Sequence, residues 1–348
     1  MGVQAESSNI QPETAAEARV IQESSREIWI RRLKTLAPVW TLLVMWIIFS
    51  LASPSFATPA NFNNILAQVA TAGILAVGMT FVLLTGEIDL SIAGVMGLSA
   101  YVATQFYTIH HLPEPLPVIA GLIVGTLCGM GSGIISTVIR VPTFMATLAM
   151  SLIAEGLLLW TSQGTQYFKL SPFPLWIGSA KLGGDDGLRS GVFILLTTIC
   201  LLIGYLVLRY TRFGRYVYMT GANPSAARLA GVNTRAMVFA VLTISGFTAG
   251  LAGIAAMGRL GTALPAPQSN FLIQAIAVVV LGGTSLTGGR GGMWQTAVGL
   301  LIYGSLSNGL DNIANINSFQ KTFITGLVLL AALVVNIVFA GKAERDRT

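Results

Sequence analysis

Residues 65–107 of the chain read ILAQVATAGILAVGMTFVLLTGEIDLSIAGVMGLSAYVATQFY. The stretch contains two apolar runs, 65–84 and 90–107, and each is close to the length of about 20 residues that a helix needs to cross a hydrocarbon core about 30 Å thick. Its only charged residues are Glu87 and Asp89, at the junction between the runs. The stretch therefore predicts two membrane-spanning helices joined by a short junction that carries two acids.

The composition of the whole chain points to the same class of protein. The 348 residues are 53% hydrophobic and 10% charged, with 38 glycines, and the mean hydropathy is +0.73. A soluble domain carries roughly 25% charged residues, because water must solvate its surface. The composition excludes a disordered chain, a disulfide-rich secreted domain and a soluble nucleic-acid binder, although the net charge is +6.

Ten apolar runs of about span length occur along the chain. We expect an all-α integral membrane protein with about ten transmembrane helices, in which the third, fifth and eighth spans are short or glycine-rich enough to be broken or re-entrant. The expected spans are 37–53, 65–84, 90–107, 117–139, 142–160, 191–209, 237–258, 270–287, 293–311 and 321–340. Two series of regularly spaced glycines predict close helix packing; they are Gly121, Gly125, Gly129 and Gly133 in the fourth span, and Gly246, Gly250 and Gly253 in the seventh.

The distribution of Lys and Arg predicts the orientation, because short cytoplasmic loops retain an excess of these residues. With ten spans and a cytoplasmic N-terminus, 15 of the 20 Lys and Arg residues fall on the inner side. We therefore expect both termini in the cytoplasm, a polar tail over 1–35, a transmembrane domain over 36–340 and a second tail over 341–348. The basic charge then follows from topology, and no nucleic-acid partner is needed to explain it.

The segments outside the spans are too small to form a catalytic domain. The only Gly-Lys pair, Gly341-Lys342, is followed by Ala343, so it does not match a phosphate-binding loop. Cys128 and Cys200 lie inside apolar runs and predict neither a disulfide nor a metal site. We expect a chain that is not an enzyme and holds no cofactor or metal, with any ATP hydrolysis on a partner chain.

Glu87 and Asp89 permit two interpretations. Acids at membrane depth usually face the interior of a bundle or a water-filled path, which makes both residues functional candidates. Alternatively, 85–91 is a short inner loop in which the acids are solvated and Asp89 caps the next helix. The residues alone do not decide between the two. Glu155, a third acid, fits an interfacial position near the outer end of the fifth span.

A second junction, residues 280–292, reads VLGGTSLTGGRGG. Its glycines exclude an ordinary continuous helix. Gly282, Gly283 and Thr284 therefore belong either to an unwound segment, of the kind that forms substrate sites in transporters, or to a compact inner turn held by Arg290.

The loop over 210–236 contains arginines and no acids, and residues 212–235 read RFGRYVYMTGANPSAARLAGVNTR. Asn223 ahead of Pro224 predicts the start of a short helix over 225–229, which Gly231 ends. The loop therefore predicts a small basic helix on the inner face, where another protein can bind.

Three blocks of the chain resemble the permease subunits of bacterial ABC importers for monosaccharides, of the ribose, xylose, arabinose and galactose type. Residues 78–91 resemble the family's G-M-T-x-V-x-x-x-G-G-I-D-L-S, residues 214–231 its G-R-x-x-Y-x-x-G-x-N-x-x-A-A-x-x-x-G, and residues 280–292 its V-L-G-G-T-S-x-x-G-G-x-G. The resemblance covers about 40–340. Glu87 departs from the pattern, because the family usually has Gly there.

The resemblance implies a multi-pass permease of the bacterial inner membrane that moves a sugar by alternating access. It implies three protein partners besides the lipid bilayer: a second permease, a cytoplasmic ABC ATPase and a periplasmic sugar-binding protein. It also implies that 224–229 is the coupling helix, docked on the ATPase and positioned by Arg212, Arg215, Asn223, Pro224, Ala227, Arg228 and Gly231. The residues that then line the translocation path or position its helices are Glu87, Asp89, Gly282, Gly283 and Thr284.

Two other transport functions stay open at this point. An ion-coupled secondary transporter would use Glu87, Asp89 or Glu155 as a proton or cation site and would need no ATPase. An ABC permease for amino acids or another non-sugar solute is a closer alternative. The I-D-L-S block favours sugars, by resemblance only.

Overall fold

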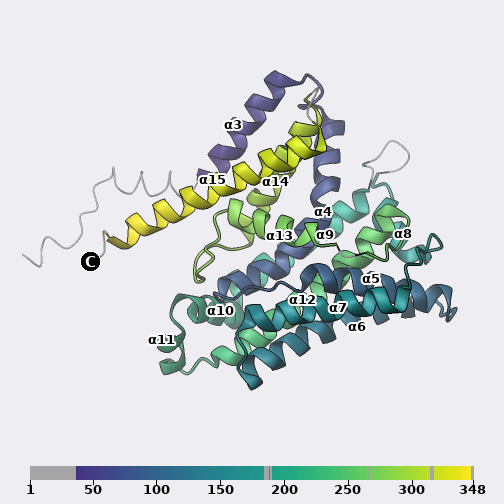
Figure 1. Cartoon of the computed structure of the whole chain (residues 1–348). Helices are drawn as coiled ribbons and strands as arrows, with labels where there is room; N and C mark the ends of the chain where they lie inside the picture. Colours follow the sequence, from purple (N-terminus) through teal and green to yellow (C-terminus); the bar gives the residue numbers. More distant parts are fainter. Residues whose placement is uncertain (1–36, 184–187, 189, 267, 314–316, 346–348) are drawn as a thin grey trace, which may run out of the picture.

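The computed structural model describes residues 37–183, 188, 190–266, 268–313 and 317–345. This part of the chain is helical, and its only β structure is a pair of isolated bridges, Tyr167–Ala263 and Leu182–Leu188. The predicted tail over 1–35 lies outside the described residues. In chain order the elements are α3 (Ala37–Ala52), α4 (Pro59–Leu84), α5 (Ile92–Thr108), α6 (Leu116–Ile134), the π-helical turn η1 (Ile135–Ile139), α7 (Thr143–Ser162), α8 (Pro172–Ser179), α9 (Gly191–Tyr210), α10 (Arg212–Ala222), α11 (Pro224–Leu229), α12 (Thr234–Leu260), α13 (Asn270–Leu281), α14 (Met293–Asp311) and α15 (Ser318–Arg345), as Figure 1 shows.

Each predicted span contains one helix, so the all-α prediction is confirmed for the described residues. Within the part of the chain that the structure describes, five helices are long and apolar enough to cross a membrane, namely α4, α6 with η1, α7, α9 and α12. The predicted eighth span, 270–287, is wrong at its C-terminal end, because α13 stops at Leu281. Its 12 residues extend about 18 Å, less than the thickness of a bilayer core. The total number of spans and the location of the termini stay predictions.

The predicted glycine packing is confirmed at the contact between α6 and α12. A Cβ atom built on Gly125 would lie 2.6 Å from the carbonyl oxygen of Gly246, and one built on Gly129 would lie 3.1 Å from the Cα of Gly246. Gly250 faces the carbonyl oxygen of Gly121 in the same way. Gly121, Gly125 and Gly129 therefore face Gly246 and Gly250 and bring the two backbones into direct contact, which larger side chains would prevent. Gly253 lies against the backbone of Met96 on α5 instead.

Helix α4 is the centre of the bundle and packs against α9, α12, α13 and α14. Its most apolar window is 89% buried, whereas the corresponding window of α9 is 28% buried. The exposed side chains of the outer helices are large and apolar, for example Leu152 and Trp160 on α7 and Ile203 on α9. An apolar surface of this kind is typical of helices that face lipid.

The bundle has two distinct ends, because α4 starts at one and finishes at the other. The end of α4 lies beside the short helices α10 and α11, the last turn of α6 and the start of α12 (Figure 1). At the opposite end, α8 packs against the last turn of α12, where Gly178 and Gly258 permit close contact. The first end carries the segments that the sequence analysis singled out.

Candidate functional site

Helix α11 has the start and stop that the sequence predicts. The side-chain oxygen of Asn223 accepts hydrogen bonds from the backbone N–H groups of Ser225 and Ala226, both at 3.0 Å. These bonds satisfy amides that have no partner within the helix. At the other end, Gly231 adopts a φ of +83°, a conformation that glycine accommodates without strain.

The two faces of α11 differ sharply. Ala227 is 1% exposed and packs against the rest of the protein, whereas Leu229 is 91% exposed. Arg228 is also exposed, and its guanidinium donates a 3.1 Å hydrogen bond to the Ser225 hydroxyl. Ala227 therefore packs the helix against the bundle, and Leu229 leaves a large apolar side chain exposed at the surface. The sequence analysis overlooked Leu229, although it is the only large apolar residue in an otherwise small and polar helix.

The first junction, residues 85–91, and the second junction, residues 280–292, both lie against α10. The N–H of Gly289, in the second junction, donates a 2.9 Å hydrogen bond to the carbonyl oxygen of Leu84, where α4 ends and the first junction begins. The hydroxyl of Tyr218 on α10 donates to the carbonyl oxygen of Gly291 at 2.9 Å. Gly221, also on α10, touches Leu84 and Gly289 so closely that a Cβ atom would clash with both. Three segments far apart in the sequence therefore form one packed unit.

Residues 282–292 form a compact turn rather than an extended unwound segment. The N–H of Ser285 donates to the carbonyl oxygen of Arg290 at 3.0 Å, so backbone groups close the turn. Gly282 is buried against the backbone of α14, and Thr284 is fully buried. Gly283 is exposed, with a φ of +96°. The compact alternative of the sequence analysis is therefore the observed one.

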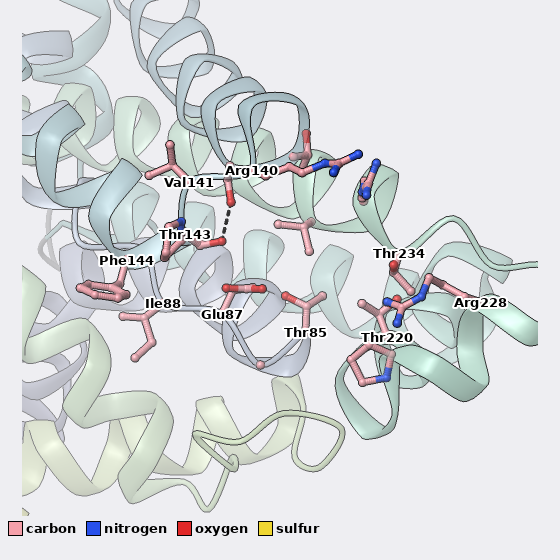
Figure 2. Close-up of a pocket in the computed structure, with 17 residues that line it drawn as sticks. Thr85, Glu87, Ile88, Arg140, Val141, Thr143, Phe144, Thr220, Arg228 and Thr234 are labelled. Atoms are coloured by element: carbon pink, nitrogen blue, oxygen red, sulfur yellow. Dashed lines mark hydrogen bonds between the residues drawn. The ribbon is translucent and has the colours of Figure 1, made fainter.

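A cavity of about 500 Å³ lies between the first junction, the turn that joins α6 to α7, and the loop over 210–236. Figure 2 shows Glu87 at its centre, with Arg140 and Arg228 at its rim. The residues that line it are Thr85, Gly86, Glu87, Ile88, Ser136, Thr137, Arg140, Val141, Pro142, Thr143, Phe144, Thr220, Pro224, Arg228, Thr234, Arg235 and Val238. The cavity therefore joins α11 directly to the junction that carries the two acids.

Glu87 is half-buried. Among the residues that line this cavity it is the one acid, and the other charged residues are arginines. Burial raises the pKa of Glu87 above its ordinary value, and a hydrogen bond with the Thr143 side chain opposes that rise. The Thr143 hydroxyl also lies 2.6 Å from the Ser136 hydroxyl. Arg140 and Arg235, which the sequence analysis did not select, lie in the same cavity because the fold brings three loops together.

Asp89 has a different environment, with only 1% of its surface exposed. Its Oδ1 atom accepts hydrogen bonds from the N–H and the hydroxyl of Ser91, at 2.8 and 2.6 Å. Burial raises the pKa of Asp89, while the hydroxyls of Ser245 and Ser91 oppose the rise. Asp89 does not cap α5, because the residue at the cap position is Ser91. It closes the turn that leads into the helix instead.

The remaining arginines that the sequence analysis selected in the loop over 210–236 lie on α10. Arg212 begins the helix and is exposed. Arg215 is also exposed and lines a separate cavity together with Tyr218 and Gly291. The loop therefore presents a basic surface on both sides of the packed unit that α10 forms with the two junctions.

The arrangement of a capped, outward-facing helix on a membrane bundle can be compared with known proteins. The family described as "Branched-chain amino acid transport system / permease component" matches residues 61–333. The chain belongs to this permease family. The permease is 36% identical to the ribose import permease protein RbsC of Escherichia coli (strain K12), over 88% of this chain and 94% of that protein. It is 35% identical to the ribose import permease protein RbsC of Bacillus subtilis (strain 168), over 87% and 93%, and 34% identical to the fructose import permease protein FrcC of Rhizobium meliloti, over 85% and 84%.

The family assignment decides between the transport mechanisms that the sequence left open. The permease is a subunit of an ABC importer, a multi-pass protein of the bacterial inner membrane, and not an enzyme. Permeases of this family act with an ATPase and a binding protein, so the energy comes from a partner chain. The ion-coupled alternative, with Glu87, Asp89 or Glu155 as a cation site, is therefore not supported.

Proposed function

We propose that the chain forms the membrane path for a monosaccharide and that α11 transmits the motion of the ATPase to the two junctions. The observation that carries the proposal is the contrast between Ala227 and Leu229, because one side of the helix is fixed to the bundle and the other is free to bind. The relatives named for ribose and fructose import support a sugar as the substrate.

In this proposal the ATPase docks on the loop over 210–236, which we call the coupling loop. Within it, Asn223, Pro224 and Gly231 set the bounds of α11. Arg212, Arg215 and Arg228 supply positive charge to the docking surface, and Ala227 seats the helix. A force on α11 reaches α4 through α10, because Gly221 touches Leu84. Hydrogen-bonded and tightly packed elements can carry such a displacement, since they do not deform continuously.

The two acids then have separate roles. Glu87 faces the cavity between the coupling loop and α7, so a movement of α11 changes its surroundings directly. Asp89 positions the start of α5 through Ser91. Gly282, Gly283 and Thr284 keep the second junction compact against α14, beside the path.

The orientation follows the distribution of basic residues. Ten spans with both termini in the cytoplasm place the coupling loop inside and α8 outside, where the periplasmic binding protein docks. A second permease, either a copy of this chain or a sister chain, completes the path.

The first test is purification of the tagged chain in mild detergent, followed by mass spectrometry of its partners. We expect an ATPase at a fixed ratio, with a hydrolysis rate that rises when a periplasmic protein loaded with D-ribose or D-fructose is added. If only an amino-acid-loaded protein raises the rate, the sugar assignment is wrong. If the chain purifies alone and its vesicles accumulate solute under a proton or sodium gradient, the coupling assignment is wrong as well.

A further inference from the structure

A second cavity lies between α4, α13, α14 and α15, at the end of the bundle opposite the coupling loop. Its volume of about 540 Å³ falls within the range of about 300–1,000 Å³ that is typical of small-molecule sites. Gln68, on its wall, lies nine residues after Pro59, so it lies about 13 Å from the start of α4. The cavity is therefore on the side from which an importer of the proposed orientation receives its substrate.

The wall of this cavity is rich in neutral polar groups. Amides and hydroxyls come from all four helices, and the aromatic ring of Phe271 lies among them. The polar residues that matter here are Gln68, Asn270, Gln274, Tyr303, Ser307 and Thr322. Each amide and each hydroxyl can both donate and accept a hydrogen bond. Sugar hydroxyls have the same dual capacity, so the wall matches a neutral polyol.

Three of these side chains are available to a ligand. Gln68 donates to Ser307, and Thr322 donates to the carbonyl oxygen of Ser318. By contrast, no hydrogen bond to another group in the described part of the chain engages Asn270, Gln274 or Tyr303. Gln274 and Tyr303 are also half-buried. The polar atoms of Gln274 and Tyr303 are not among the buried, unpaired ones, and Asn270 is exposed, so all three side chains can hydrogen-bond to a molecule that enters the cavity.

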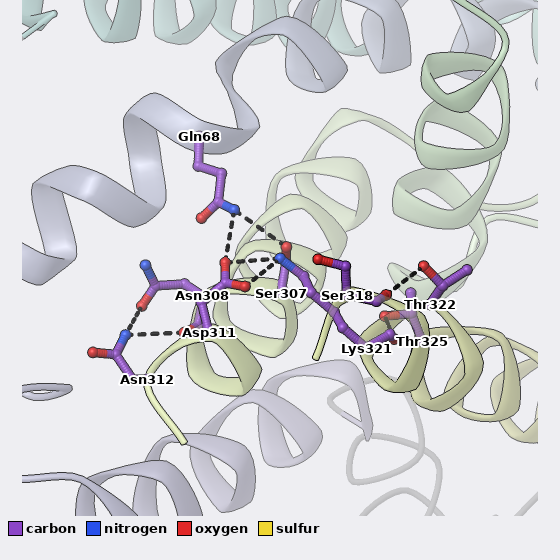
Figure 3. A network of polar contacts seen from close by, with 9 residues as sticks. All are labelled: Gln68, Ser307, Asn308, Asp311, Asn312, Ser318, Lys321, Thr322 and Thr325. Atoms are coloured by element: carbon purple, nitrogen blue, oxygen red, sulfur yellow. Dashed lines mark hydrogen bonds and ion pairs between the residues drawn. The ribbon is translucent and has the colours of Figure 1, made fainter. Parts of the chain in front are cut away.

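Lys321 is the charged residue on the cavity wall, and its charge is already paired. The ammonium group of Lys321 lies 2.7 Å from both carboxylate oxygens of Asp311. The amide of Gln68 donates to the same carboxylate at 3.3 Å. Figure 3 shows Gln68, Asp311 and Lys321 converging in this way from three helices. A zwitterionic amino acid would have to break this ion pair to find charged partners, whereas a neutral sugar leaves it intact.

We propose that this cavity is a monosaccharide-binding subsite, in which Asn270, Gln274 and Tyr303 hydrogen-bond to the hydroxyl groups of the sugar. The assignment rests on the proposed function, in which the substrate is a sugar. It adds the place of binding within the permease itself, outside the two glycine-rich junctions.

The first experiment measures protection of an introduced thiol in the full chain, with Cys128 and Cys200 replaced by Ser. Thr322→Cys places the thiol on the cavity wall. Thr161→Cys is the matched control, because Thr161 is also exposed, hydrogen-bonds to the carbonyl four residues earlier and lies at the same end of the bundle, on α7. D-Ribose at twice its dissociation constant should slow maleimide labelling at position 322 about threefold. Labelling at position 161 should not change, and L-leucine should protect neither.

The second experiment separates the subsite from the proposed function. In the Thr322→Cys chain, Gln274→Leu should raise the D-ribose dissociation constant obtained from protection roughly fivefold, the effect of one lost hydrogen bond. Gln105→Leu, which removes an amide on α5 outside the cavity, should leave it unchanged. Uptake of labelled D-ribose, D-xylose and D-fructose is measured in proteoliposomes that contain the complete transporter.

Each outcome has a distinct meaning. Uptake of a sugar together with selective protection at position 322 by that sugar supports the subsite. If a sugar is taken up but does not protect, or protects equally after Gln274→Leu, the subsite is refuted and the proposed function stands. If only L-leucine is taken up and protects, both the subsite and the sugar assignment are wrong.

Discussion

Replacement of Leu229 by Ser should weaken binding of the ATPase without destabilising the permease. Leu229 is 91% exposed, so folding buries very little of it and most of its apolar surface is available to a partner. Burying a Leu side chain contributes about 1.5–3 kcal/mol. A loss of about 2 kcal/mol corresponds to a roughly 30-fold higher dissociation constant. The cost to folding is limited to helix propensity, at most about 0.5 kcal/mol.

The assay is the affinity of the purified ATPase for the permease in nanodiscs, measured by biolayer interferometry, together with the thermal unfolding temperature. Leu260→Ser is the matched control, because Leu260 is also the last residue of its helix and is 58% exposed, but lies at the opposite end of the bundle. We expect normal ATPase affinity for the control and normal unfolding temperatures for both variants. Equal affinity for Leu229→Ser and wild type would refute the docking surface.

Three further predictions concern packing and buried acids. Asp89→Ala should lower the unfolding temperature more than Asp89→Asn, because Asn keeps an oxygen that can accept from Ser91; equal losses would contradict the positioning role. Gly129→Ala should destabilise the chain by about 1–3 kcal/mol, since its Cβ would meet the α12 backbone, whereas Gly131→Ala meets only the flexible end of a Met side chain; comparable denaturation profiles would contradict the packing argument. Because burial raises the pKa of Glu87, the folded state binds its proton more tightly than the unfolded state, so stability falls as pH rises above the unfolded pKa. Glu87→Gln should therefore raise the unfolding temperature at pH 7, with a gain that shrinks toward pH 4.5; a gain independent of pH would argue against burial as the cause.

Much of the local structure could be predicted because its signals are local. The apolar runs predicted the helices, and Asn223, Pro224 and Gly231 predicted the bounds of α11 through capping and backbone conformation. The spacing of the glycines on α6 and α12 predicted close helix packing, but not that these two helices would contact each other. The end of α13 was predicted too late, because Leu286 extended the apolar run beyond Gly282 and Gly283, although the helix ends at Leu281 and Gly283 has a positive φ.

The candidate site was harder to predict, because its geometry depends on distant contacts. Sequence analysis selected Glu87 and Arg228, but it could not place them around one cavity or add Arg140 and Arg235 to it. It considered Asp89 as a helix cap, whereas the fold buries this residue behind Ser91. Nothing in the sequence indicated which face of α11 would be outermost.

The sequence by itself determined that this protein is a helical membrane protein with a basic, capped helix between two long spans, because hydropathy, charge and capping act between near neighbours. Only the tertiary structure decided that Ala227 faces inward and Leu229 outward, that Gly289 bonds to Leu84, and that amides and hydroxyls from four helices surround a second cavity. Those features depend on how helices far apart in the sequence pack together, and packing is set by the shapes of all the contacting surfaces at once.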